Sequence, residues 1–259
     1  MISKPATMSK ESAFFAFPFA MVDPVVRVDA TGSVTGTDVE SVPGGATHMR
    51  AVRRWIALLA GDLAIAWATQ DAPLVQVGSI VVPYVPFPRS TPSTEPATIY
   101  SWIHGNLWDT NFPSQQAFEM TFHYSVAAAR AADPDAASAF AARCADVTAR
   151  PLAAVLAPVV GGGGPAADSD GAVLRSSDDR VRIVGLTVPD ERHVLVRLQS
   201  CSAERLRVAI TTGGAAAGHA WQATYLGEPL DELVLDDGAV HIEVGPFGTA
   251  AVLFELPDL

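Results

Sequence analysis

The chain has 259 residues, 49% of them hydrophobic and 17% charged, so it can bury one large or two modest cores. Its 28 acidic and 17 basic residues give a formal net charge of −11, which opposes binding to nucleic acid or to an anionic membrane. No apolar stretch approaches the ~18 residues of a membrane span, so we expect a cytoplasmic protein. Cys144 and Cys201 form no CxxC pair and are expected to be free thiols.

Strands dominate the first half of the chain. Alternating or continuous apolar segments, separated by turn residues, predict strands at 12–19, 25–30, 49–59, 63–69, 73–82, 97–103 and 117–126. One helical segment is expected near 133–150, because Asp133 can cap it, Pro134 suits its first position and Pro151 would end it.

A glycine-rich segment divides the sequence. Residues 159–171, VVGGGGPAADSDG, cannot form a packed element and predict a connection between a module at 1–158 and a second module at 172–259. The second module is predicted to be an antiparallel sandwich with strands at 181–188, 193–200, 205–210, 239–244 and 249–256. Between its last strands, Asp237-Gly238 suits a tight hairpin turn, so Asp236 and Asp237 are expected to form a turn and not a catalytic acid pair.

Catalytic and metal motifs are sparse. None of the six histidines has the spacing of a metal motif, and no GxSxG elbow, phosphate loop or dinucleotide fingerprint occurs. Asp109 and Glu119 are the candidates for a carboxylate pair of the kind that glycoside hydrolysis needs. The alternative is that Asp109 bonds to its own loop and that Glu119 lies on an exposed strand face.

The most unusual stretch is HGNLWDTNFP, residues 104–113, which crowds aromatic, acidic and amide side chains before a strand. Trp108 and Phe112 could provide flat faces for a sugar ring, or they could plug the end of a sandwich. Hydroxyl groups of a sugar need paired donors and acceptors. Such groups are offered by Asn106, Asp109, Thr110 and Asn111.

Five segments, taken in order, resemble the C-terminal β region of glycoside hydrolase family 38 α-mannosidases. They are ESAFFAFPFA, SVPGGATHMRAVRRWIALL, LAIAWATQDAPLVQVG, HGNLWDTNFPSQQAFEMTFHYS and EPLDELVLDDGAVHIEVGPFGTAAVLFEL. The WDTNFP and QDAPLV segments are the most specific. The chain departs from the family in having His104-Gly105-Asn106 where Asn-Asn is common, and Pro246-Phe247-Gly248 where Pro-Phe-Glu is usual.

The resemblance implies an all-β fold, with a large mutarotase-like antiparallel β-sandwich followed by a smaller β-sandwich module. Family members are zinc-dependent hydrolases that remove α-linked mannose, and their nucleophile and zinc ligands lie in an N-terminal region that nothing here resembles. The resemblance therefore implies that this chain has no catalytic residue and no cofactor, and that zinc belongs to a catalytic domain missing on its N-terminal side. The implied partners are that domain, in cis or in trans, and a mannose-containing glycan.

In the family, loops of this region help to form a wall of the sugar cleft, so the resemblance implies substrate contacts from His104, Asn106, Asp109 and Asn111. Contact with the catalytic domain alone remains an alternative for the same loop. A stand-alone carbohydrate-binding module is a second hypothesis. A third is a mutarotase-like sugar isomerase that uses His123 with Glu119, although two positions so spaced on one strand would lie about 13 Å apart.

Overall fold

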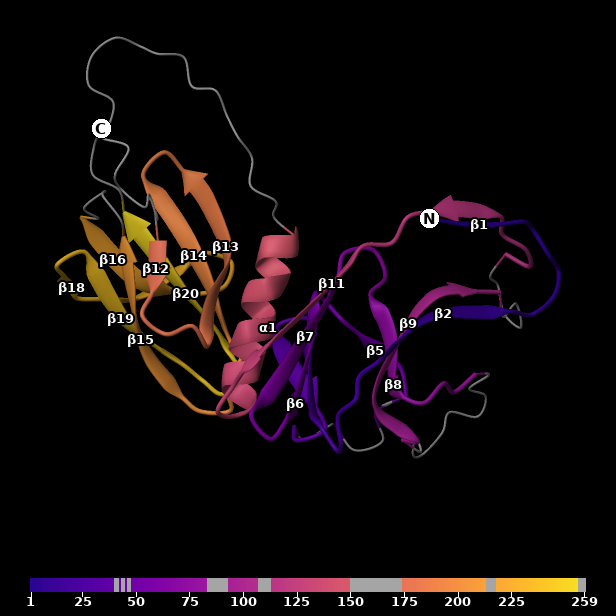
Figure 1. The fold of residues 1–259 in the computed structure, drawn as a ribbon. Helices are drawn as coiled ribbons and strands as arrows, with labels where there is room; N and C mark the ends of the chain where they lie inside the picture. The colour runs from indigo at the N-terminus through magenta and orange to yellow at the C-terminus, as the bar shows by residue number, and fades with distance from the viewer. Residues whose placement is uncertain are drawn as a thin grey trace, which may run out of the picture. The chain divides into compact units, whose positions relative to one another are not determined.

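A computed structural model describes residues 1–39, 42, 45, 48–82, 93–106, 113–149, 174–212 and 218–255. The chain forms two compact units, Met1–Arg150 and Pro151–Leu259, called unit 1 and unit 2 below (Figure 1). The predicted connection at 159–171 lies outside the described residues, so its position and the module boundaries remain predictions.

Unit 1 contains eleven described strands and one helix. The strands are β1 (Ile2–Lys4), β2 (Ser12–Pro18), β3 (Val25–Ala30), β4 (Ser33–Gly36), β5 (Arg50–Ala51), β6 (Trp55–Ala60), β7 (Leu63–Thr69), β8 (Leu74–Gly78), β9 (Glu95–Gly105), β10 (Phe118–Met120) and β11 (Tyr124–Arg130). They form an antiparallel sheet in the order β11-β7-β6-β3-β4, another in the order β2-β9-β8-β5, and a small β1-β10 pair.

The core of unit 1 lies between its two larger sheets. Val28, Ile56 and Trp67 from the first sheet contact the same apolar cluster as Val75 and Ile99 from the second, and all five are fully buried. The unit is therefore a β-sandwich, as expected.

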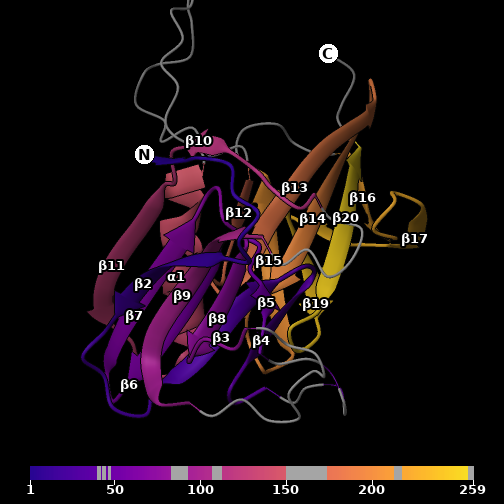
Figure 2. The same cartoon turned by 90° about the vertical axis from the view of Figure 1, so that its right-hand side faces the viewer.

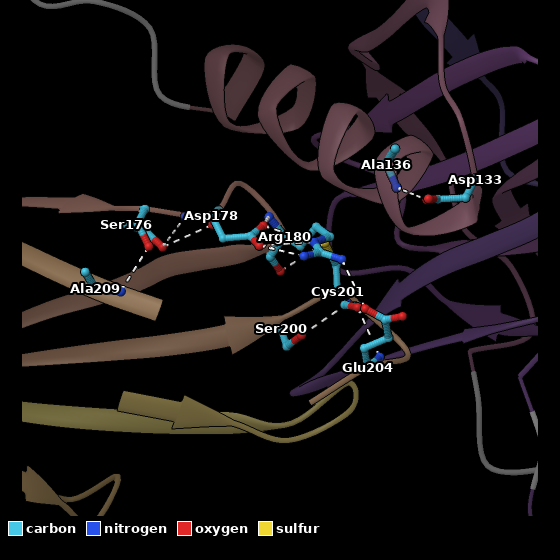
Figure 3. A network of polar contacts seen from close by, with 11 residues as sticks. Asp133, Ala136, Ser176, Asp178, Arg180, Ser200, Cys201, Glu204 and Ala209 are labelled. Carbon is cyan, nitrogen blue, oxygen red and sulfur yellow. Dashed lines mark hydrogen bonds and ion pairs between the residues drawn. The ribbon is translucent and has the colours of Figure 1, made fainter. Parts of the chain in front are cut away.

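Helix α1 (Pro134–Ala149) covers the other face of the first sheet, where it contacts β3, β6, β7 and β11. Alanines dominate both surfaces: Ala57 and Ala66 lie opposite each other on β6 and β7, and the helix buries Ala141 and Ala145. Small side chains on both sides allow the helix backbone to approach the sheet closely. The predicted helix is confirmed, and Asp133 caps it by accepting a hydrogen bond from the Ala136 amide at 2.8 Å (Figure 3).

A buried arginine also ties the helix to the sheet. Arg27 on β3 is 5% exposed; its Nη1 lies 2.5 Å from Asp135 Oδ1 in the first turn of α1, and its Nη2 lies 2.8 Å from Asp38 Oδ2. Burial opposes the charge of Arg27, but hydrogen bonds to both carboxylates outweigh this effect and raise its pKa.

Unit 2 contains nine described strands. They are β12 (Leu174–Ser176), β13 (Val181–Asp190), β14 (His193–Ser200), β15 (Leu206–Thr212), β16 (His219–Ala223), β17 (Pro229–Glu232), β18 (Leu235–Asp236), β19 (Ala239–Val244) and β20 (Thr249–Glu255). Two antiparallel sheets, β12-β15-β19-β18 and β13-β14-β20-β16-β17, make up the unit (Figure 2). They enclose an apolar core that includes Leu198, Ile210 and Phe254. The edge strands β13 and β17 contain Pro189 and Pro229.

Two turns in unit 2 illustrate how sequence fixes local structure. Asp237 and Gly238 have φ angles of 47° and 74°, and they join β18 to β19 in the hairpin that the sequence predicts. Before β13, Asp178 and Arg180 pair at 2.7 Å, and Arg180 also reaches Glu204 at 3.4 Å (Figure 3). This ionic network joins the connection between β12 and β13 to the segment that precedes β15.

Two expected strands are interrupted, and the reason is the same. The 49–59 pattern divides into β5 and β6, which belong to different sheets, and Val52 between them donates a backbone hydrogen bond to Pro73. The 117–126 pattern likewise divides into β10, which pairs with β1, and β11, which pairs with β7. An alternating pattern persists through a change of pairing partner, so periodicity alone misses the break.

Both cysteines are free thiols, as expected, with Cys201 buried and Cys144 half-buried. Within the described part of the chain, no helix is long and apolar enough to cross a membrane.

Candidate functional site at the end of strand β9

Strand β9 leads directly into the stretch that the sequence singles out. Ile99 and Ser101 face the core and are fully buried. The register with β2 then shifts, because Phe14 pairs with Trp102 and Ala13 with His104, which leaves one extra residue in β9. This bulge reverses the alternation, so that His104 and Asn106 are buried while Gly105 between them is exposed.

Asn106 fastens the N-terminal segment to the end of β9. Its backbone amide donates to the Glu11 carbonyl at 2.7 Å, and its Nδ2 donates to the carbonyls of Thr7 and Ser9 at 2.9 and 2.8 Å. Asn106 is only 2% exposed, and its buried Oδ1 has no hydrogen-bond partner. Its amide nitrogen is therefore committed to protein structure, and the oxygen is its one unused polar atom.

His104 lies beside Asn106 and, like it, has a buried polar atom without a hydrogen-bond partner. The imidazole is 7% exposed and lies 5.2 Å from the Phe118 ring on β10, and its buried Nε2 has no hydrogen-bond partner. Burial lowers the pKa of His104; the Lys4 charge lowers it further, while Glu11 acts in the opposite direction. The neutral imidazole is thus favoured, with a ring nitrogen available inside the protein.

The other two predicted contact residues, Asp109 and Asn111, lie outside the described residues, as do Trp108 and Phe112. The structure therefore brings together His104 and Asn106 at the base of the predicted loop. Sugar contact by any of the four remains a prediction.

The proposed acid–base partnership of Glu119 with His123 does not match the observed contacts. Glu119 lies on β10 opposite Ser3, whereas His123 precedes β11. His123 Nδ1 lies 3.0 Å from Asp71 Oδ2, and the same carboxylate accepts the His123 backbone amide at 2.6 Å. The assumption that Glu119 and His123 share one strand is wrong, because the chain changes sheets between them.

A second hydrogen bond joins the segments that contain Asp71 and His123. Gln70 also donates its backbone amide to the His123 carbonyl, at 3.2 Å. Two of the segments that carry the family resemblance, far apart in sequence, therefore meet next to β11.

The comparisons with known proteins agree with this architecture. No protein-family model matches the sequence, and no curated protein matches it. Among solved structures, an alpha-mannosidase from Enterococcus faecalis V583 matches with a TM-score of 0.63 and 14% identity, over 93% of this chain and 25% of that chain. The fold is similar to that of part of a family 38 α-mannosidase.

A second solved structure gives the same result. It is a protein in glycosyl hydrolase family 38 from Enterococcus faecalis, with a TM-score of 0.63 and 15% identity, over 93% of this chain and 26% of that chain. The chain thus spans about a quarter of the length of each matched protein.

Sequence reasoning missed several polar groups that the fold assembles. The contact of Arg27 with Asp135 joins residues 108 positions apart in sequence. The pairing of His219 with Glu232 lies on strands that the periodicity does not predict. No local signal identifies such pairs, since each depends on which strands become neighbours.

Proposed function

We propose that this chain serves as the non-catalytic β region of an α-mannosidase-type glycoside hydrolase and packs on a catalytic domain in cis or in trans. The observation that carries the proposal is the pair of matches to family 38 proteins, each covering 93% of this chain but only about a quarter of the other protein. The matched region makes up nearly all of this chain but only about a quarter of each matched protein. This coverage supports a role as one domain of a larger enzyme.

The end of β9 is proposed to form part of one wall of the sugar cleft. His104 and Asn106 are buried and form the base of the wall, since Asn106 fixes the N-terminal segment through three hydrogen bonds. Asp109 and Asn111 follow within five residues and are the proposed contacts for sugar hydroxyl groups.

Zinc is assigned in this proposal to the catalytic domain. Across the described ranges of the chain, no three His, Cys, Asp or Glu side chains are grouped to hold a metal ion. The proposal therefore places neither zinc ligands nor a catalytic step on this chain.

The test is reconstitution with a family 38 catalytic domain from the same genome, either as the natural partner polypeptide or as the natural fusion. The chain alone should not hydrolyse an aryl α-mannoside with added zinc, and its presence should raise the solubility and turnover of the catalytic domain. Equal turnover with and without the chain would refute the proposal. Glycan binding by the chain alone, without an effect on hydrolysis, would favour a stand-alone carbohydrate-binding module.

Conservative variants then test whether the loop that follows β9 contacts the sugar. Asp109→Asn and Asn111→Asp should lower turnover or weaken substrate affinity while leaving the complex intact. Asp231→Asn, on the exposed edge strand β17, is the matched control and should change neither quantity. Unchanged kinetics in all three variants would leave the loop without a role at the cleft.

A further inference from the structure

Trp221 occupies a distinctive position on the outer face of a sheet in unit 2. It lies on β16, and its side chain packs on a small apolar cluster that contains Leu195 and Leu253 from the neighbouring strands. The ring is half-buried, so part of it faces solvent. The indole Nε1 has no hydrogen-bond partner among the described residues, in contrast to Trp102 Nε1, which donates to the His104 carbonyl at 2.5 Å.

Two histidines flank this ring. His193 on β14 and His219 on β16 are both directly opposite Glu255 on β20, so the three side chains form one row across adjacent strands. Two strand spacings place the histidine backbones about 10 Å apart. The centroids of the His193 and His219 rings lie 6.3 and 5.8 Å from that of Trp221.

Each imidazole is held by a carboxylate. His193 Nδ1 lies 2.9 Å from both oxygens of Asp190, and His219 Nδ1 lies 2.9 Å from Glu232 Oε1. Hydrogen bonds from the Arg192 backbone and from the His193 side chain lower the pKa of Asp190, which keeps it ionised. A carboxylate at Nδ1 orients the ring and leaves Nε2 available to a ligand.

Each carboxylate around the row already has a hydrogen-bonding or ionic partner. Glu255 pairs with Arg192 at 2.8 Å, and the other two carboxylates hold the histidines. A cationic ligand would therefore find no unpaired carboxylate, while an uncharged ligand with many hydroxyl groups would find donors and acceptors around an aromatic surface. Such a combination suits a sugar ring, which places its C–H face on an aromatic side chain and bonds through its hydroxyl groups.

The dimensions favour a small ligand over a protein. A stable protein interface needs about 800 Å² from each partner, whereas a single half-buried tryptophan with two imidazoles offers far less. The His219–Glu232 pair also lines an open pocket of about 300 Å³ together with Gly218 and residues 233–235, but Trp221 and His193 do not line it.

We infer that unit 2 carries a carbohydrate-binding site in which a pyranose ring stacks on Trp221 and its hydroxyl groups bond to the Nε2 atoms of His193 and His219. The site is separate from the β9 loop on unit 1, so it does not rest on the proposed partnership with a catalytic domain. It assigns a binding function to the β13-β14-β20-β16-β17 sheet.

The experiment uses the intact chain labelled with ¹⁵N, whose five tryptophans give separate indole N–H signals. α-Mannotriose and cellotriose are titrated in separate samples, and the Trp221 signal is assigned by its loss in Trp221→Phe. Saturable movement of that signal with either sugar supports the inference. His193→Ala and His219→Ala should each weaken binding by about tenfold, the effect of losing one hydrogen bond.

Controls separate this site from other causes. His219 has a 59% exposed side chain, so its replacement should leave the other indole signals in place and test the site without unfolding. Trp102→Ala, which removes a half-buried tryptophan from unit 1, should leave the affinity unchanged. No movement of the Trp221 signal with either sugar would overturn the inference, as would movement that occurs with Zn²⁺ and not with the sugars.

Discussion

The two units bury polar groups in different ways. In unit 1, buried side-chain atoms without a hydrogen-bond partner include the Nε1 atoms of Trp55 and Trp67, His104 Nε2 and Asn106 Oδ1. Among the residues that the structure describes in unit 2, no such atom occurs, and the charged pairs around Trp221 lie on an outer face. Both units are antiparallel sandwiches, so the contrast does not follow from fold class.

The two units therefore differ in how much folding stability they lose to unpartnered buried polar atoms. An unpartnered buried polar atom costs about 1–3 kcal/mol, so proteins keep few of them and those that persist call for an explanation. Two of the atoms in unit 1 lie at the end of β9, next to the predicted loop. Unit 2 also buries polar side chains, among them Gln199, Ser200 and Ser202, but none of their described side-chain atoms is both buried and without a hydrogen-bond partner.

The largest effect is expected from Arg27→Ala in unit 1. The substitution leaves Asp135, whose side chain is 12% exposed, without its buried guanidinium, and should cost about 3–5 kcal/mol. Urea denaturation measures the loss. Arg130→Ala is the control, because Arg130 and Asp62 form an exposed pair and its removal should change stability by no more than about 0.5 kcal/mol. Equal effects in the two variants would refute the stabilising role of the buried Arg27 contacts.

A core substitution in unit 2 should come next. Leu198 is fully buried in the apolar cluster, and Leu198→Ala should cost about 3 kcal/mol through lost burial and the cavity left behind. Hydrogen exchange on the intact chain would show which unit opens. Leu186→Ala, on the same sheet but 51% exposed, should have little effect. A small loss for Leu198→Ala would mean that the interior of unit 2 is loosely packed.

Asn106→Ala should cost about 1–2 kcal/mol, because the carbonyls of Thr7 and Ser9 lose their donor. Backbone amides of residues 6–11 should exchange faster with solvent while β9 stays protected. Asn106→Asp sharpens the test, since it keeps the side-chain size but replaces the donating nitrogen with a carboxylate oxygen. If Asn106→Asp were as stable as the parent chain, the anchoring role of the side-chain nitrogen would be refuted.

The smallest effect concerns pH. Burial lowers the pKa of His104 from its ordinary value of 6.5, so the unfolded chain binds more protons than the folded one between the two pKa values. Stability should therefore fall as pH decreases below 6.5, with an uptake of at most about one proton. Urea titrations between pH 5 and pH 8 should show a shallower fall in His104→Gln, whereas His241→Gln, at an exposed position, should keep the original slope.

Local patterns were sufficient for much of the fold. The helix at Pro134–Ala149 follows from its capping residue and proline, and the hairpin at Asp237-Gly238 follows from the positive φ angles that its turn requires. The breaks at Val52–Arg54 and at 121–123 could not be predicted, because each marks a change of sheet that depends on distant strands.

The candidate site shows the same limit. Composition identifies residues 104–113 as unusual, but the burial of His104 and Asn106 depends on the bulge in β9, which reverses the side-chain alternation and depends on the register with the distant strand β2. The group around Trp221 was also beyond sequence reasoning. Its members come from β14, β16 and β20, and only their pairing brings them into one row.

The prolines on the two outermost strands of the larger sheet in unit 2 bear on how the molecule behaves at high concentration. A proline lacks the amide hydrogen needed to extend a sheet, and Pro189 and Pro229 place this interruption on β13 and β17 respectively. All four residues of β17 are exposed, and two of them, Asp231 and Glu232, are acidic. A second copy therefore meets missing donors and like charge along β17, which disfavours edge-to-edge self-association.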